Sequence, residues 1–247
     1  MSSVRIQYDG RLGNHVLIYL MAQYIAEKYN LYFDQNLWNN NFNDHFIVNK
    51  FSGNIIYDQF YTVNDDNIMT FLQQKTLCKG VYLINGFFQS PEIFKINNLI
   101  ESYKKYIIPK TLECKNDLFV HVRLGDIKNK FSLPYEYYKK SIEKIKFNSG
   151  IIASDNVDDE IVIKLSKEYN LKILNESAEY TVRYGSQCKN LVLSAGSFSF
   201  ITALFSNNSN IYFITNETQK KIYGINNWDL GMFSAFTNID NWNEFKG

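Results

Sequence analysis

The stretch "DLFVHVRLGDIKNKFSLPYEYYKKSIEKI", residues 117–145, joins a short apolar run to polar residues and then to a helical pattern. The apolar run over 118–122 is typical of a strand buried in a parallel sheet. Three ionisable side chains, those of His121, Arg123 and Asp126, stand at its carboxyl end. Open α/β sheets bind ligands at that end of their strands, so these residues are candidates for a binding site.

A surface ion pair is a second interpretation of the same residues. Arg123 and Asp126 are close enough in sequence to pair and close a turn, with no ligand involved. The pattern of this stretch alone does not separate a binding role from a structural one.

The rest of the chain repeats the alternation of strand and helix. Short apolar runs predict strands over 4–8, 80–86, 118–122, 150–154, 171–174, 191–195 and 211–215. Helical patterns lie between most of them, including 16–29 and 91–106. This alternation predicts an α/β fold of mainly parallel sheets with crossover helices.

A domain boundary is expected within 107–117, where Pro109 and a polar cluster follow a long helical pattern. The sequence therefore predicts two Rossmann-like domains, an N-terminal one over 1–110 and a C-terminal one over 111–247. The asparagine-rich tract over 38–45 has no periodicity and predicts a surface loop.

Composition limits the class of partner. The chain of 247 residues is 45% hydrophobic and 16% aromatic, which is ample for a large core. Its 26 basic and 25 acidic residues give a net charge of +1, so no global field draws it to nucleic acid or anionic membranes. Any bound anion must be held locally.

Cysteine usage and hydropathy indicate the compartment. Cys78, Cys114 and Cys188 are widely spaced and odd in number, which argues against a disulfide framework and against a zinc cluster. No run approaches 18 apolar residues, and the start MSSVRIQYDG lacks the apolar core of a signal peptide. We expect a cytoplasmic protein with no integral membrane segment.

A glycine-containing segment, GRLGN at 10–14, lies between the first predicted strand and helix. Small residues there let a ligand approach the backbone, and the following amide groups carry a partial positive charge. The spacing is neither that of a dinucleotide fingerprint nor that of a P-loop. A tight structural turn explains both glycines equally well.

Five segments together resemble one enzyme family. The segment GRLGNHVLIYLMAQYIAEKY at 10–29 is similar to the first signature of the α-1,2-fucosyltransferases (glycosyltransferase family 11) and of the wider GDP-fucose-dependent superfamily. HVRLGD at 121–126 resembles the H-x-R-R-G-D signature. The others are GFFQSPEIF at 86–94, IIASDN at 151–156 and CKNLVLSAGSFSF at 188–200. The five occur in the family's order.

The resemblance implies an inverting glycosyltransferase of the GT-B type, with two Rossmann-like domains facing a central cleft. Such an enzyme moves L-fucose from GDP-fucose to a hydroxyl of a glycan or oligosaccharide acceptor, forming an α-1,2 linkage without a metal or other cofactor. The residues fit this independently, because the sequence holds no convincing carboxylate cluster for a Mg²⁺-bound diphosphate.

Arg123 is the expected catalytic partner of the leaving diphosphate. Its planar fork can bind phosphate oxygens bidentately, and the resemblance places it on the β-phosphate. Leu124 stands where the family has a second arginine, and strand alternation predicts that it points into packing. The resemblance implies that His121 lies near the guanine or ribose, with a hydrogen-bonded core histidine as the alternative. Asp126 can orient Arg123 or contact the sugar, and we expect it to orient Arg123.

The other donor-binding candidates follow predicted strands. Ser154 and Asp155 can cap the next helix, and the resemblance gives Asp155 a contact with guanine. Ser197, Phe198 and Ser199 open a helix and offer amides and hydroxyls to a phosphate, Ser197 foremost. Phe200 and Ile201 replace the family's usual tryptophans, and the remaining donor-binding candidate is Gly13.

No residue stands out as a catalytic base. Asn14 and His15 are the candidates on the acceptor side, and His15 replaces the family's usual glutamine. The acceptor itself is expected to be selected by loops between residues 34 and 80. Two alternatives stay open: the same fold with another nucleotide sugar, and a catalytically silent sugar-binding protein.

Overall fold

The structure, a computed structural model, describes most of the chain. The described residues are 2–33, 46, 59–108, 114–128, 130–206, 209–225, 232–233 and 242–247. The chain divides into two compact units, Met1–Lys110 and Thr111–Gly247. The predicted loop over 38–45 lies outside the described residues, as does the part of the expected acceptor region over 34–45 and 47–58.

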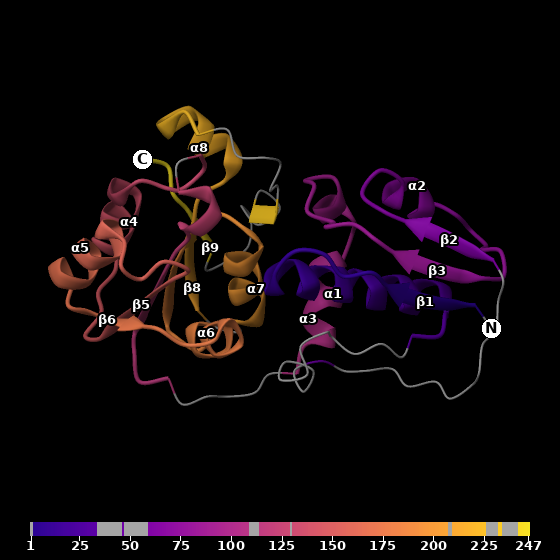
Figure 1. The fold of residues 1–247 in the computed structure, drawn as a ribbon, viewed down its shortest axis with the longest axis horizontal. Helices are drawn as coiled ribbons and strands as arrows, with labels where there is room; N and C mark the ends of the chain where they lie inside the picture. The colour runs from indigo at the N-terminus through magenta and orange to yellow at the C-terminus, as the bar shows by residue number, and fades with distance from the viewer. Residues whose placement is uncertain are drawn as a thin grey trace. The chain divides into compact units, whose positions relative to one another are not determined.

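The N-terminal unit is a small parallel sheet with its helices (Figure 1). Its elements are β1 (Ser3–Ile6), α1 (Leu12–Tyr29), β2 (Phe60–Val63), α2 (Ile68–Leu72), β3 (Val81–Ile84), the 3₁₀ turn η2 (Ile93–Lys95) and α3 (Leu99–Tyr106). The strands pair in parallel in the order β1-β3-β2. The carboxyl ends of all three strands therefore lie along one edge of this sheet.

Two helix predictions in this unit were wrong at their boundaries. Helix α1 begins at Leu12 rather than at 16, so the second half of the GRLGN segment forms its first turn. The helix predicted over 91–106 is broken, because Asn98 adopts a left-handed conformation with φ of 60° before α3 begins. An α-helix cannot continue through such a residue.

Strands and helices alternate along most of the C-terminal unit (Figure 1). They are β4 (Leu118–Val122), η3 (Gly125–Ile127), α4 (Tyr135–Ile142), β5 (Gly150–Ser154), α5 (Glu160–Glu168), β6 (Leu171–Leu174), α6 (Ala178–Gly185), β7 (Asn190–Leu193), α7 (Ser197–Phe205), β8 (Asn210–Phe213), α8 (Asn216–Tyr223) and β9 (Trp242–Glu244). The strands predicted over 118–122, 150–154 and 171–174 are confirmed to the residue.

All six strands of this unit are parallel, in the order β6-β5-β4-β7-β8-β9. Numbered within the unit, this is the 3-2-1-4-5-6 order of a doubly wound Rossmann sheet. The predicted α/β class with mainly parallel sheets is confirmed. After β4 the chain adds β5 and β6 toward one edge of the sheet, and after β7 it adds β8 and β9 toward the other edge. The topological switch point therefore lies between the neighbouring strands β4 and β7.

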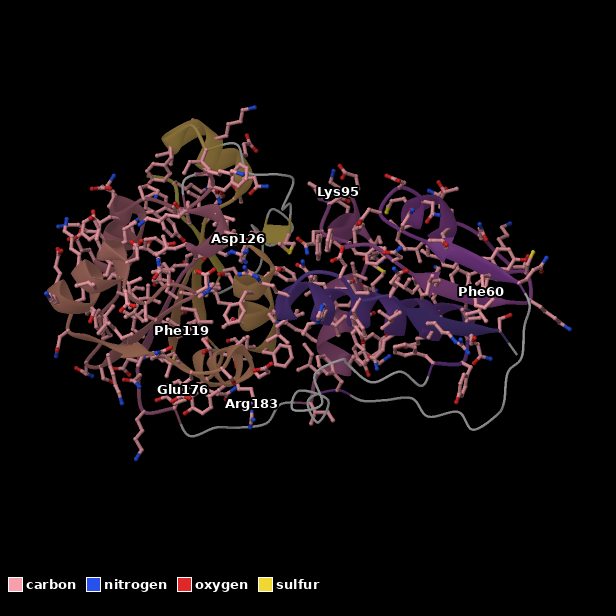
Figure 2. All side chains as sticks on the ribbon, in the orientation of Figure 1. Phe60, Lys95, Phe119, Asp126, Glu176 and Arg183 are labelled. Atoms are coloured by element: carbon pink, nitrogen blue, oxygen red, sulfur yellow. The ribbon has the colours of Figure 1, made fainter. Side chains whose placement is uncertain are left out.

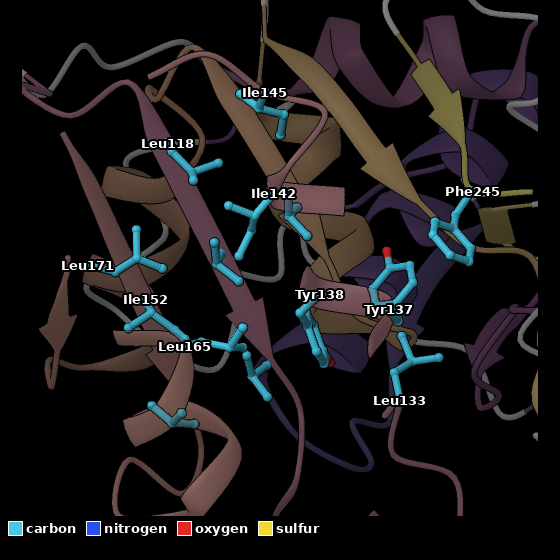
Figure 3. Packing of buried hydrophobic residues seen from close by; sticks show 14 of the residues in the cluster. Leu118, Leu133, Tyr137, Tyr138, Ile142, Ile145, Ile152, Leu165, Leu171 and Phe245 are labelled. Atoms are coloured by element: carbon cyan, nitrogen blue, oxygen red, sulfur yellow. The ribbon is translucent and has the colours of Figure 1, made fainter. Parts of the chain in front are cut away.

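The alternation of side chains along β4 divides them between the two faces of the sheet. Leu118, Val120 and Val122 belong to a fully buried cluster with residues of α4 and α5 (Figure 3). Leu124 is also fully buried in this cluster, so the prediction that it points into packing is confirmed. His121 belongs to the alternate set and contacts α7 on the other face.

Among the described residues, no helix combines the length and the apolar character needed to cross a lipid bilayer.

Tyr137→Phe should destabilise the protein by about 1 kcal/mol, measured by urea unfolding. The hydroxyl of this fully buried residue donates to the Leu193 carbonyl at 2.6 Å and so anchors α4 to the end of β7. Tyr103→Phe is the matched control, because Tyr103 is equally buried and its hydroxyl has no partner among the described residues. Equal losses in the two variants would contradict the anchoring role.

Candidate functional site

The strand register brings two turns of the C-terminal unit together. In the β4–β7 pair His121 lies opposite Leu193, so both strands end at the same level. Arg123 follows directly after β4, and Gly196 is the residue before α7. The two turns therefore meet at the switch point of a doubly wound sheet, where such sheets bind their ligands.

Arg123 is held at this position with part of its guanidinium unused. Its Nη2 donates to Asp126 Oδ1 at 2.9 Å, and the side chain is 19% exposed. No acceptor among the described residues lies within hydrogen-bond distance of its buried Nε. Figure 2 labels Asp126 in the turn that follows β4. The ion pair that the sequence suggested is thus present, and it leaves donor capacity for a ligand.

The N-terminus of α7 lies beside Arg123. Gly196 caps the helix with φ of 118° and ψ of 164°, a conformation open essentially to glycine alone. A Cβ at Gly196 would lie 3.8 Å from both Cδ and Nη1 of Arg123. As a glycine, the N-cap residue has no side chain to cap α7, and the first turn of the helix holds no acidic residue. The helix dipole and the guanidinium therefore create a positive potential in the same place.

His121, in β4, contacts residues on both sides of the turn between β7 and α7. Its Nδ1 lies 2.7 Å from Ser199 Oγ and 3.2 Å from Ser194 Oγ, and its ring packs on Phe198 with 4.7 Å between centroids. Burial lowers the pKa of His121 to about 3, with the nearby Asp155 opposing and Arg123 reinforcing that shift. The imidazole is therefore neutral near pH 7 and adds no charge to the site.

Ser194 is a site residue that the sequence analysis missed. Its hydroxyl lies 3.2 Å from the Ser199 hydroxyl, so these two serines and His121 form one buried polar network. The only signal was its place at the end of the strand predicted over 191–195. Ser197 and Phe198 complete the first turn of α7, and Ser197 is 9% exposed.

Asp155 does not cap the following helix, contrary to the prediction. Helix α5 begins at Glu160 and is capped by Asp159, whose Oδ1 accepts from the Ile161 amide at 3.0 Å. Asp155 Oδ1 instead accepts from the Leu124 amide at 2.9 Å. The carboxylate lies so near Gly125 that a Cβ there would approach its Oδ2 to 2.2 Å. Asp155 thus fixes the turn that carries Arg123.

Ser154 does not cap the helix either. Its hydroxyl accepts from the Asn156 amide at 3.0 Å and closes a turn directly after β5. Asp158 precedes the cap, and Asp159 forms an ion pair with Lys128. Asp155 reaches the Arg123 turn, while Ser154 is engaged in its own turn.

The N-terminal unit joins two of the quoted segments. Gln89 Nε2 donates to Asn14 Oδ1 at 2.8 Å, which connects the start of α1 to the residues after β3. His15 is 5% exposed, and its ring centroid lies 5.1 Å from that of Tyr8. Burial lowers the pKa of His15, so it is mainly neutral near pH 7. Gly13 is buried in the first turn of α1.

Asp65 is a second residue that the sequence analysis missed. Its two carboxylate oxygens accept from the backbone amides of Phe87 at 2.7 Å and Phe88 at 2.6 Å. Phe88 is held at φ of 53°, a strained value for a side chain of that size, and Phe87 is 40% exposed. Asp65 therefore fixes the turn after β3, and no local pattern around it predicted this.

Comparison with known proteins found no matching family model and no matching curated protein.

His121→Asn should flatten the acid dependence of stability. The folded-state pKa of His121, about 3, lies below the unfolded value near 6.5, so the unfolded chain binds the proton more tightly. The contribution of His121 to the free energy of unfolding is therefore fully present above about pH 6.5. It falls by about 1.4 kcal/mol per pH unit as the pH drops toward 3.

Urea unfolding between pH 7 and 4.5 measures this slope. The wild-type slope also contains a contribution of the same sign from His15, whose pKa is lowered too, and this part persists in the variant. The account is contradicted by a His121→Asn slope equal to that of the wild type.

Proposed function

We propose that the protein is an inverting glycosyltransferase that moves L-fucose from GDP-fucose to a sugar hydroxyl, forming an α-1,2 linkage. The observation that carries the proposal is the pairing of Arg123 with the N-terminus of α7 at the switch point. The buried Nε of Arg123 has no hydrogen-bond partner among the described residues, and the N-cap of α7 is a glycine, which has no side chain to cap the helix. Both features suit the diphosphate of a nucleotide sugar.

The residues at this point belong to the segments that resemble the fucosyltransferase family. Arg123 comes from HVRLGD, Asp155 from IIASDN, and Gly196 and Ser197 from CKNLVLSAGSFSF. The main departure, Leu124, is fully buried among apolar side chains and so lies away from the site. This placement explains how the family's second arginine can be absent without the loss of the Arg123 site.

The proposed chemistry needs stabilisation of the leaving group more than it needs a nucleophile on the protein. The acceptor hydroxyl attacks the anomeric carbon from the face opposite the diphosphate, which inverts the configuration. As the bond to the β-phosphate breaks, negative charge grows on its oxygens, and Arg123 and the amides of α7 are positioned to stabilise it without a metal. Asp126 and Asp155 act by holding Arg123 and its turn.

The proposal assigns the donor to the C-terminal unit and the acceptor to the N-terminal unit, the division of labour of a GT-B enzyme. At the carboxyl edge of the N-terminal sheet, Asn14, Gln89 and Phe87 offer an amide pair and an exposed aromatic ring, which suit a sugar. His15, mainly neutral near pH 7, is one titratable group at this edge, and we assign to it the late removal of the hydroxyl proton.

GDP and GDP-fucose should raise the melting temperature, GMP should do so less, and UDP should have no effect. A ligand that binds only the folded state stabilises it by mass action, and GMP lacks the phosphate assigned to Arg123. A thermal-shift panel with these four nucleotides and GDP-mannose measures the order. A response to UDP alone would overturn the GDP-fucose assignment and favour another nucleotide sugar. Binding of GDP-fucose with no transfer to any acceptor would favour a silent sugar-binding protein.

Arg123→Lys should leave the protein folded and lower transfer by roughly 10²- to 10³-fold, because lysine keeps the charge but loses the planar fork. Asp126→Asn is the matched variant, since it breaks the ion pair and keeps the guanidinium. A partly exposed pair of this kind is worth about 0 to 1 kcal/mol, so neither change should much alter stability.

Steady-state transfer assays and GDP titrations of both variants separate the two roles of Arg123. We expect Asp126→Asn to retain far more activity than Arg123→Lys, and Arg183→Lys on α6 to behave as the wild type. Near-normal turnover by Arg123→Lys would falsify its assignment to the diphosphate.

A further inference from the structure

Two cysteines that are remote in sequence meet in the C-terminal unit. The Sγ atoms of Cys114 and Cys188 lie 2.9 Å apart, and both residues are free thiols. Cys188 is 1% exposed, while Cys114 is only half-buried and so open to small reagents. The third thiol, Cys78, is exposed and belongs to the N-terminal unit.

The pair lies at the amino ends of β4 and β7. Cys114 lies four residues before the start of β4, and Cys188 lies two residues before the start of β7. The Asn190 amide of β7 donates to the Asp117 carbonyl at 2.8 Å. Arg123 lies beyond the other end of β4, so a strand of about 16 Å separates the thiols from the proposed donor site. The pairing of the same two strands thus aligns the cysteines at one end and the site at the other.

The surroundings make the two thiols chemically unequal. Hydrogen bonding from the Cys188 thiol lowers the pKa of Cys114, and burial opposes this only in part. The same interaction, together with burial, raises the pKa of Cys188. The interaction thus favours the thiolate, the form that reacts with disulfides and peroxides, on the half-buried Cys114.

We propose that Cys114 and Cys188, whose sulfurs lie 2.9 Å apart, form a reversible redox site, in which the more accessible Cys114 attacks and the buried Cys188 resolves the product as an intramolecular disulfide. The oxidant belongs to the class of small-molecule disulfides, such as oxidised glutathione. In the reducing compartment expected for this protein the site rests as the dithiol, and it closes when the surrounding thiol pool is oxidised.

The exchange balances in two steps. The Cys114 thiolate attacks one sulfur of glutathione disulfide, forms a mixed disulfide and releases one glutathione thiolate. This removes the negative charge beside Cys188, whose thiol can then lose its proton to the departing glutathione. Cys188 attacks the Cys114 sulfur and releases the second glutathione. Two electrons leave the protein and two molecules of reduced glutathione form.

The disulfide would close a loop between residues 74 positions apart and would join the entry of the chain into the C-terminal unit to the start of β7. Crosslinks of this length reduce the conformational freedom of the unfolded chain, so oxidation should raise the melting temperature, on the order of 5 °C or more.

Glutathione buffers of increasing oxidised fraction test the proposal on the full chain carrying Cys78→Ser. Remaining thiols are trapped with N-ethylmaleimide under denaturing conditions, and the intact mass is measured. The expected product has lost two hydrogens, carries no maleimide, yields a linked Cys114–Cys188 peptide and melts at a higher temperature. Dithiothreitol should reverse both the mass change and the melting shift.

Two further variants act as controls. In the same background, Cys114→Ser should show neither the disulfide nor the melting shift, and Cys188→Ala should accumulate glutathione on Cys114. If Cys188→Ala does not fold, the comparison of Cys114→Ser with its parent decides. Two trapped maleimides in oxidised glutathione, or a lasting glutathione adduct on Cys114 with Cys188 still free, would overturn the proposal.

Discussion

The parallel pairing of β4 with β7 is the constraint on which both proposed sites depend. These strands are separated in sequence by three crossover helices, and their pairing ends with His121 opposite Leu193. It places Arg123 beside Gly196 at the carboxyl end and Cys114 beside Cys188 at the amino end. The position of Arg123, the residue proposed to bind the diphosphate, thus depends mainly on backbone hydrogen bonds and apolar packing. Its neighbours in the sequence matter less.

Much of the fold could be predicted because its central strands are short apolar runs bounded by turns. The strand over 118–122 is buried along its whole length, and such strands have a clear sequence signal. Strand β2 was missed because only Val63 of its four residues is buried, and β9 because its three residues, Trp242–Glu244, are too few and too polar for a pattern. The break at Asn98 depends on a backbone angle, which hydrophobic periodicity does not reveal.

Contacts in the candidate site could be predicted only between residues that are close in the sequence. Arg123 and Asp126 are three residues apart in one turn, so their ion pair could be foreseen. The partner of Asp155 could not, because the Leu124 amide is 31 residues away and the two meet only through the β4–β5 pairing. The same holds for Ser194, whose contact with His121 spans 73 residues.

A crystal structure of the protein with GDP bound would show directly whether Arg123 and α7 hold the diphosphate. We expect β-phosphate oxygens within hydrogen-bond distance of the Arg123 guanidinium and of backbone amides in the first turn of α7. We also expect His121 and Asp155 to keep the contacts described above, because these contacts hold the site in place before the ligand binds. A diphosphate bound elsewhere, with Arg123 paired to Asp126 alone, would show that Arg123 is not the diphosphate ligand.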